Sequence, residues 1–286
     1  MSLSEASPLV STKWLADHLD APDVRVVDAS WHMPSEGRDA FEEYRSAHIP
    51  GAVYFDINDI ADKDCGLPHM LPPAEMFSSR VRKLGLGNGN KIVVYDTKGL
   101  FSAARVWWMF RVMGHQDVCV LDGGFPKWRA DGHPVEDLPP RPRERHFISR
   151  VNRELVRDIE QVKAACQKGH EQIFDARGPG RFKGEDGEPR EGMRSGHMPG
   201  ARNVPFPALL NDDKTFKSSE EVRSIFENAG LDFDKPVVTS CGSGVTACIL
   251  TLALELTGKT DVAVYDGSWS EWGTREDVDV ETGAAS

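Results

Sequence analysis

Residues 91–110 read KIVVYDTKGLFSAARVWWMF, and residues 235–254 read KPVVTSCGSGVTACILTLAL. Each stretch begins with a short apolar run rich in β-branched residues, passes through a turn that contains glycine and ends in an apolar helical pattern. The two stretches start at Lys91 and Lys235, 144 residues apart, and the same offset relates Trp128 to Trp272. Landmarks matched in the same order indicate two copies of one domain.

The repeat also extends upstream of these stretches. VVDAS around Asp28 matches IFDAR around Asp175, and HIPG at 48–51 matches HMPG at 197–200. The offset drifts to 149 at the second pair, which is the change that insertions in loops produce. Two copies of one domain therefore account for most of the chain.

Strands and helices alternate within each copy. In the first copy, runs suited to buried parallel strands lie at 24–29, 52–55, 91–96 and 118–122, and helical patterns lie at 38–47, 73–84 and 102–113. This alternation predicts an α/β fold, in which each domain has a mainly parallel sheet with helices on both faces. We expect domains at residues 9–138 and 157–282, with a linker at 139–156 whose start is rich in proline and arginine.

Composition and charge limit the classes of function. The formal net charge of −11 argues against general binding to nucleic acid or to anionic membranes, because both are met with lysine and arginine. No apolar run approaches the roughly 20 residues of a membrane helix, and the first residues lack the features of a secretory signal. The five cysteines are widely spaced without a CxxC pair, so we expect neither disulfides nor a zinc site, but a protein of the reducing cytoplasm.

The loop SCGSGVT, which begins at Ser240, carries the clearest chemical signal. A core strand precedes the loop and an apolar helix follows it, so that backbone N–H groups and the positive end of the helix converge on an anion nest. Cys241, at the end of the strand, places its sulfur in this nest, which favours the thiolate over the thiol. Gly242 and Gly244 are expected to let the backbone curl around the sulfur, since glycine tolerates a positive φ.

A merely buried, inert cysteine is the alternative for Cys241, and it is our interpretation of Cys119 and Cys248. A Gly-Ser-Gly turn after a core strand has no packing rationale, which favours the reactive role for Cys241. In the first copy Thr97 lies at the matching position, with no adjacent base motif. We expect that copy to be catalytically silent and to supply one wall of a cleft between the domains.

The CGSGVT loop, the tandem repeat and the HxPG motifs together resemble the rhodanese superfamily of sulfurtransferases, over residues 9–280 or so. The loop is similar in particular to the CG[ST]GVT loop of 3-mercaptopyruvate sulfurtransferases, whereas thiosulfate sulfurtransferases carry basic residues at the second and third positions. Gly242 and Ser243 occupy those positions here. Two cations would stabilise the thiosulfate dianion beside a thiolate, so a neutral loop favours a thiol-bearing keto acid with one carboxylate.

The resemblance implies that Arg181 and Arg190 hold the carboxylate of the substrate, a task for which the arginine fork is suited. Arg177 is expected to be structural and to form a salt bridge near Asp175. On the residues alone, an alternative is that Arg181 and Arg190 are solvated loop residues. They would then pair with neighbouring acids, namely Glu185, Asp186, Glu188 or Glu191.

The resemblance also implies a proton relay made of Ser243, His69 and a carboxylate. Asn58 stands where the carboxylate is expected, so Asp56 or Asp59 would have to substitute for it, or the relay is absent. The substrate site would further include four residues of the loop: Gly242, Gly244, Val245 and Thr246.

The implied reaction begins with attack of the Cys241 thiolate on the sulfur of 3-mercaptopyruvate, which leaves a persulfide and releases pyruvate. A thiol such as thioredoxin, or cyanide, then takes the outer sulfur, and no metal or organic cofactor is required. Two alternatives stay open: a thiosulfate sulfurtransferase on the same scaffold, and a persulfide carrier or interaction module. A phosphatase or arsenate reductase is excluded, because it needs an arginine six positions after the cysteine, where Ala247 stands.

Overall fold

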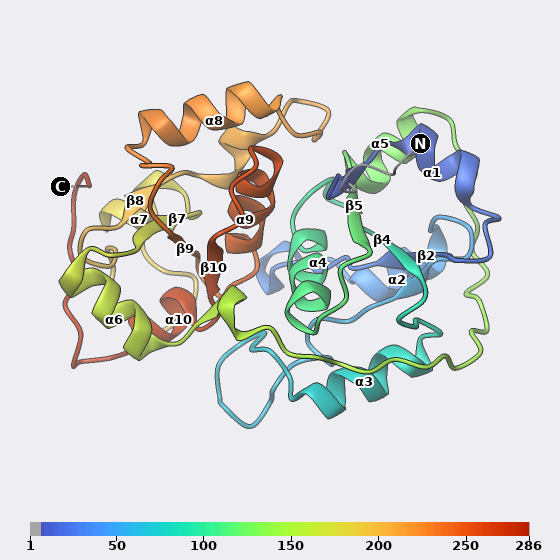
Figure 1. The fold of residues 1–286 in the computed structure, drawn as a ribbon, viewed down its shortest axis with the longest axis horizontal. Coiled ribbons are helices and arrows are strands. Elements are labelled where there is room, and N and C mark those ends of the chain that lie inside the picture. Colours follow the sequence, from blue (N-terminus) through green and yellow to red (C-terminus); the bar gives the residue numbers. More distant parts are fainter. Residues whose placement is uncertain (1–6, 286) are drawn as a thin grey trace. The chain divides into compact units, whose positions relative to one another are not determined.

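A computed structural model describes residues 7–285 of the chain. The chain divides into two compact units (Figure 1). The first unit holds the described residues up to Ala61 together with Leu71–Asn152 and Asn211–Phe216. The second unit holds Asp62–Met70, Arg153–Leu210 and the described residues from Lys217 onward. Each unit thus includes a short segment from the other half of the sequence, which the repeat did not predict.

Each unit is built on a five-stranded sheet. In the first unit the order is β1-β5-β4-β2-β3, with β1 at Leu9–Val10, β2 at Val24–Asp28, β3 at Val53–Tyr54, β4 at Lys91–Tyr95 and β5 at Val118–Leu121. In the second unit the order is β6-β10-β9-β7-β8, with β6 at Val156–Arg157, β7 at Gln172–Asp175, β8 at Arg202–Asn203, β9 at Val237–Ser240 and β10 at Val262–Tyr265. Neighbouring strands of these two sheets are parallel. The same strand order in both sheets confirms the predicted α/β duplication.

Helices follow the strands in both units. The first unit contains α1 (Thr12–His18), α2 (Ala40–Ser46), α3 (Ala74–Lys83), α4 (Ala103–Val112) and α5 (Gly124–Ala130). The second contains α6 (Ile159–Lys168), α7 (Pro179–Lys183), α8 (Ser219–Asn228), α9 (Ala247–Leu256) and α10 (Ser268–Trp272). A capping box begins α8, because the side chains of Ser218 and Glu221 each accept a hydrogen bond from the other's backbone N–H group. None of the helices in the described part of the chain is long and apolar enough to span a membrane.

The central strand and helix of the second unit are buried together. All of β9 is buried, and α9 is buried from its first residue to Leu254, as expected of a helix that is apolar on nearly every side. The loop between β9 and α9 is therefore anchored in the core at both ends, which fixes the position of Cys241.

The stretch that we expected to form the linker packs onto the first unit as far as Asn152. Phe147 is fully buried there, and its ring lies 5.8 Å from that of Phe77 and 6.0 Å from that of Phe110. The Arg150 N–H group donates a hydrogen bond to the Met113 carbonyl oxygen at 2.8 Å. An aromatic side chain in an otherwise polar stretch thus ties it to the first core.

The histidines of the two HxPG motifs have equivalent structural roles. His48 donates from Nδ1 to the Tyr44 carbonyl oxygen at 2.7 Å, and His197 donates from Nδ1 to the Phe182 carbonyl oxygen at 2.8 Å. Each histidine also forms an antiparallel bridge with a residue near the end of its own copy, Glu136 or Glu281. The motif therefore connects the middle of each copy to its carboxyl-terminal end.

Candidate active site

Cys241 lies directly after β9, and its side chain is almost fully enclosed, since the residue is 2% exposed. Its N–H group donates to Ser268 Oγ at 3.2 Å, and its carbonyl oxygen accepts from the Trp269 N–H group at 3.0 Å. The segment after β10 therefore holds the backbone of Cys241. The amino end of α9 follows the loop, and the positive end of a helix stabilises a thiolate.

The two glycines of the loop differ in backbone conformation and in surroundings. Gly244 has a φ of +73°, a conformation that side chains with a Cβ rarely adopt. Gly242 does not have a positive φ, so our expectation for it was wrong. A Cβ at Gly242 would instead lie 3.1 Å from Arg181 Nη2. A side chain at this position would therefore press against the Arg181 guanidinium, which would have to shift by a few tenths of an ångström.

The structure brings both predicted carboxylate-binding arginines to this loop. Arg181 lies against Gly242 and also pairs with Glu188, so the resemblance and the alternative of a local ion pair each describe part of its environment. Arg190 donates from Nη1 to Ser270 Oγ at 3.3 Å, and that hydroxyl donates to the Gly242 carbonyl oxygen at 2.6 Å. Burial lowers the pKa of Arg190, against the opposing effect of nearby Cys241.

Arg177 is structural, as predicted. It binds both carboxylate oxygens of Asp175, the shortest contact being 2.7 Å, and its guanidinium lies 4.2 Å from the ring centroid of Trp269. A second partner was not predicted: Arg177 Nη1 donates to Glu188 Oε1 at 2.7 Å. One buried carboxylate thus joins this structural arginine to the arginine beside the loop.

The members of the predicted relay lie in two different units. Ser243 is buried in the loop, and His69 is buried in the segment Asp62–Met70, which belongs to the same unit as Cys241. Asp56 belongs to the first unit, where its carboxylate accepts a hydrogen bond from the Asn58 N–H group at 2.7 Å. The relay stays a prediction.

The remaining loop residues support the geometry of the site. Val245 is buried, and Thr246 is the residue that immediately precedes α9. The expectation that they line the substrate site stays a prediction.

The matching loop of the first unit is filled by its own carboxylate. Asp96 follows β4, and its Oδ2 atom accepts hydrogen bonds from three successive N–H groups at the start of α4, those of Phe101, Ser102 and Ala103, at 2.7 to 3.0 Å. Ser240 stands at the equivalent position of the second unit. The start of α4 is therefore occupied by the Asp96 carboxylate, whereas the matching residue before α9 has no carboxylate. Our sequence analysis missed this, although the aspartate-for-serine difference was its signal.

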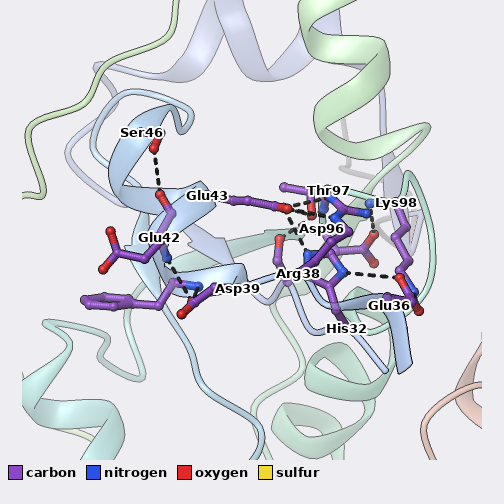
Figure 2. A network of polar contacts seen from close by, with 12 residues as sticks. His32, Glu36, Arg38, Asp39, Glu42, Glu43, Ser46, Asp96, Thr97 and Lys98 are labelled. Carbon is purple, nitrogen blue, oxygen red and sulfur yellow. Dashed lines mark hydrogen bonds and ion pairs between the residues drawn. The ribbon is translucent and has the colours of Figure 1, made fainter. Parts of the chain in front are cut away.

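A polar network surrounds Thr97, the residue that matches Cys241 (Figure 2). Thr97 Oγ1 lies 3.5 Å from Glu43 Oε2. Glu43 is distant from Thr97 in the sequence, so the absence of a base motif next to Thr97 did not predict this carboxylate. Glu43 also pairs with His32 at 2.9 Å and with Arg38 at 2.7 Å. The hydrogen bond from Arg38 holds the pKa of Glu43 below its ordinary value, which makes this carboxylate a weak base.

The other cysteines have different surroundings. Burial raises the pKa of Cys119 to about 12 and that of Cys166 to about 11, so both are thiols at neutral pH. Cys248 donates from Sγ to the Gly244 carbonyl oxygen, and Cys65 is exposed. Within residues 7–285, no group of three or more His, Cys, Asp or Glu side chains could hold a metal ion.

Comparisons with known proteins agree with this geometry. The rhodanese-like domain model matches residues 11–131 and 158–275. Human 3-mercaptopyruvate sulfurtransferase is 42% identical over 279 residues, which are 94% of each chain. Thiosulfate sulfurtransferase from Rattus norvegicus is 46% identical over 271 residues, 92% of this chain and 91% of the rat chain. The crystal structure of SseA, a 3-mercaptopyruvate sulfotransferase from Escherichia coli, matches with a TM-score of 0.85 and 40% identity, covering 93% of this chain and 100% of SseA.

Proposed function

The chain belongs to the rhodanese-like domain family and is a tandem-domain sulfurtransferase, and from this premise we propose that it takes sulfur from 3-mercaptopyruvate onto Cys241 and passes it to a thiol or to cyanide. Overall similarity does not choose the donor, because the rat thiosulfate enzyme is slightly more identical to this chain than the human 3-mercaptopyruvate enzyme. The donor preference must therefore come from the residues of the loop.

The observation that carries the proposal is the neutral start of the loop, with the Arg181 guanidinium against Gly242. A dianion such as thiosulfate gains most from cations within the loop, and this loop has glycine and serine there. A single carboxylate on a keto acid is suited to a fork held beside the loop, which Arg181 and Arg190 provide.

The first half of the reaction loads sulfur onto the enzyme. The Cys241 thiolate attacks the sulfur of 3-mercaptopyruvate, an S–S bond forms and the C–S bond breaks, and its electron pair leaves as the enolate of pyruvate, which takes up a proton. Ser243 and His69 are proposed to handle the proton of the donor thiol, with Asp56 as the supporting carboxylate. The grouping of the His69 segment with the Cys241 unit supports the part given to His69.

The second half unloads the sulfur. The acceptor, a small thiol, thioredoxin or cyanide, attacks the outer sulfur of the persulfide, and the Cys241 thiolate is the leaving group. Converging N–H groups and the amino end of α9 stabilise the anionic sulfur in both halves. The first unit is proposed to carry no sulfur, because the Asp96 carboxylate fills its nest.

The test compares two donors in the wild type and in Cys241→Ser. We expect pyruvate release from 3-mercaptopyruvate to exceed thiocyanate formation from thiosulfate and cyanide, and both to vanish in the variant. A preference for thiosulfate would show that the second candidate, a thiosulfate sulfurtransferase, is correct, while the role of Cys241 would stand. Turnover of neither donor would favour the persulfide carrier.

A further inference from the structure

Glu188 is a buried carboxylate to which the reaction above gives no task. Its side chain is 1% exposed, and it accepts hydrogen bonds from two arginines. Oε1 accepts from Arg177 Nη1 at 2.7 Å and from Arg181 Nε at 3.3 Å, and Oε2 accepts from Arg181 Nη2. A buried charge is costly unless it is paired, so both arginines are needed to keep this carboxylate where it is.

One end of this arrangement is rigid. The Arg177 side chain is buried between Asp175 and the Trp269 ring, and it also donates to the Gly196 carbonyl oxygen at 2.8 Å. Burial alone would lower the pKa of Arg177, but its pairing with Asp175 and Glu188 raises it, so this arginine stays charged. Glu188 is therefore held from the side of the core.

The other end lies at the catalytic loop. The Arg181 side chain is 28% exposed, and Glu188 takes its Nε and Nη2 groups. Nη2 and Nη1 lie 3.1 and 3.9 Å from the place of a Cβ on Gly242, so the edge that these two nitrogens share is turned toward the loop. Glu188 thus fixes which edge of the guanidinium a substrate meets.

The same contacts also compensate the positive charge of Arg181. Asp175, Arg177, Glu188 and Arg181 form one chain of ion pairs, in which two negative and two positive groups alternate. The positive charge of Arg181 is therefore compensated in part before any substrate binds, and such compensation is strong where water is excluded.

We propose that Glu188 is a positioning residue that sets the donor preference by fixing the place of Arg181 and limiting its positive charge. The inference rests on the proposed function of this site. A placed guanidinium favours the single carboxylate of 3-mercaptopyruvate, whereas an uncompensated and mobile one favours the thiosulfate dianion. Loss of the Glu188 charge makes Arg181 more mobile and leaves its positive charge less compensated, and both changes favour thiosulfate.

The experiment measures kcat and KM for both donors in Glu188→Gln. Glutamine keeps the length of the side chain and one acceptor oxygen but removes the charge. We expect the ratio of kcat/KM for 3-mercaptopyruvate to kcat/KM for thiosulfate to fall about tenfold, mainly through a higher KM for 3-mercaptopyruvate, as loss of a charge-assisted hydrogen bond predicts.

Glu171→Gln is the matched control. Glu171 belongs to the same unit, its side chain is 8% exposed, and it accepts hydrogen bonds from Arg157 Nε at 3.0 Å and Nη2 at 2.7 Å. Arg157 lies in β6, and none of the loop contacts described above involves this pair. The control should change the donor ratio less than about twofold, since it removes a similar ion pair elsewhere.

A second pair of variants tests whether Glu188 acts through Arg181. In an Arg181→Met background, Glu188→Gln should leave the donor ratio unchanged, because the partner through which it acts is gone. An equal shift in both backgrounds would overturn the inference. Glu188→Asp keeps a charge for Arg177 if the glutamine variant does not fold, and it should raise the KM for 3-mercaptopyruvate; a wild-type KM would contradict the role.

The outcomes separate this inference from the proposed function. A wild type that prefers thiosulfate contradicts the proposed donor, but the ratio can still be compared between variants. A donor ratio in Glu188→Gln equal to that of Glu171→Gln contradicts the inference, whichever donor the wild type prefers.

Discussion

At the scale of single residues, Asp28 and Asp175 are the same position of the repeat in two different environments. Asp175 pairs with Arg177, whereas Ser30 stands at the matching place in the first unit. Asp28 is fully buried and accepts a hydrogen bond from the Ser30 N–H group at 2.9 Å. Burial raises the pKa of Asp28 to about 6, because its charged form is desolvated without the arginine.

This raised pKa makes stability depend on pH. The folded pKa of Asp28 lies above the ordinary value of 3.8. The contribution of its protonated form to the free energy of unfolding is therefore fully present below about pH 4 and is lost as the pH rises through 6. Asp28→Asn removes the cost of the buried charge and should raise the free energy of unfolding at pH 8 by about 2–3 kcal/mol relative to the wild type. Urea unfolding at pH 5 and pH 8 measures it, and a difference that does not grow with pH would contradict it.

Residue-scale prediction from the sequence was uneven for a physical reason. The position of Cys241 after a buried strand, the positive φ of Gly244 and the Arg177–Asp175 pair depend on neighbours along the chain, and local sequence was enough to predict them. The contact of Arg181 with Gly242 joins α7 to the loop after β9, and only the fold selects Glu188 from the four acids named as possible partners and pairs it with Arg177 as well. No local pattern encodes such contacts.

At the scale of elements, the two strand–loop–helix turns differ in the residues that stand between the strand and the helix. The turn after β9 contains Cys241, and the turn after β4 contains the Asp96 carboxylate with Thr97 beside it. A nucleophile placed in the first unit would therefore meet a negative charge where a thiolate needs N–H donors.

This difference predicts the outcome of an attempt to activate the first unit. In a Cys241→Ser background, Thr97→Cys alone should give a thiol with a pKa near or above its ordinary value. Thr97→Cys combined with Asp96→Ser should lower that pKa by about one unit or more, because the nest is then open to the thiolate. The pH dependence of thiolate absorbance, with Cys241→Ser as the blank, measures both. Equal pKa values in the two variants would show that Asp96 does not close the nest.

At the scale of the whole molecule, duplication determines most of the architecture. The two sheets share one strand order, and both HxPG histidines bridge to the end of their own copy. Repeat landmarks and strand patterns were sufficient to predict this fold. The exchange of Asp62–Met70 and Asn211–Phe216 between the units was not predicted, because short polar segments have no periodicity that assigns them to a core.

Of the proposed catalytic set, His69 belongs to one of these exchanged segments, and Asp56 does not. The sequence could place His69 only in the first copy, whereas the fold groups it with Cys241. The fold therefore brings a segment from the first half of the sequence into the unit that contains Cys241.

The most direct test of the account is a single turnover without an acceptor. The protein is mixed with one equivalent of 3-mercaptopyruvate and quenched, because excess donor is itself a thiol and would act as an acceptor. Pyruvate is then counted and the added sulfur is located by peptide mass spectrometry. We predict a burst of about one pyruvate per chain, with the sulfur on Cys241 and removable by cyanide. A burst that persists in Cys241→Ser, or sulfur found on another cysteine, would contradict the account.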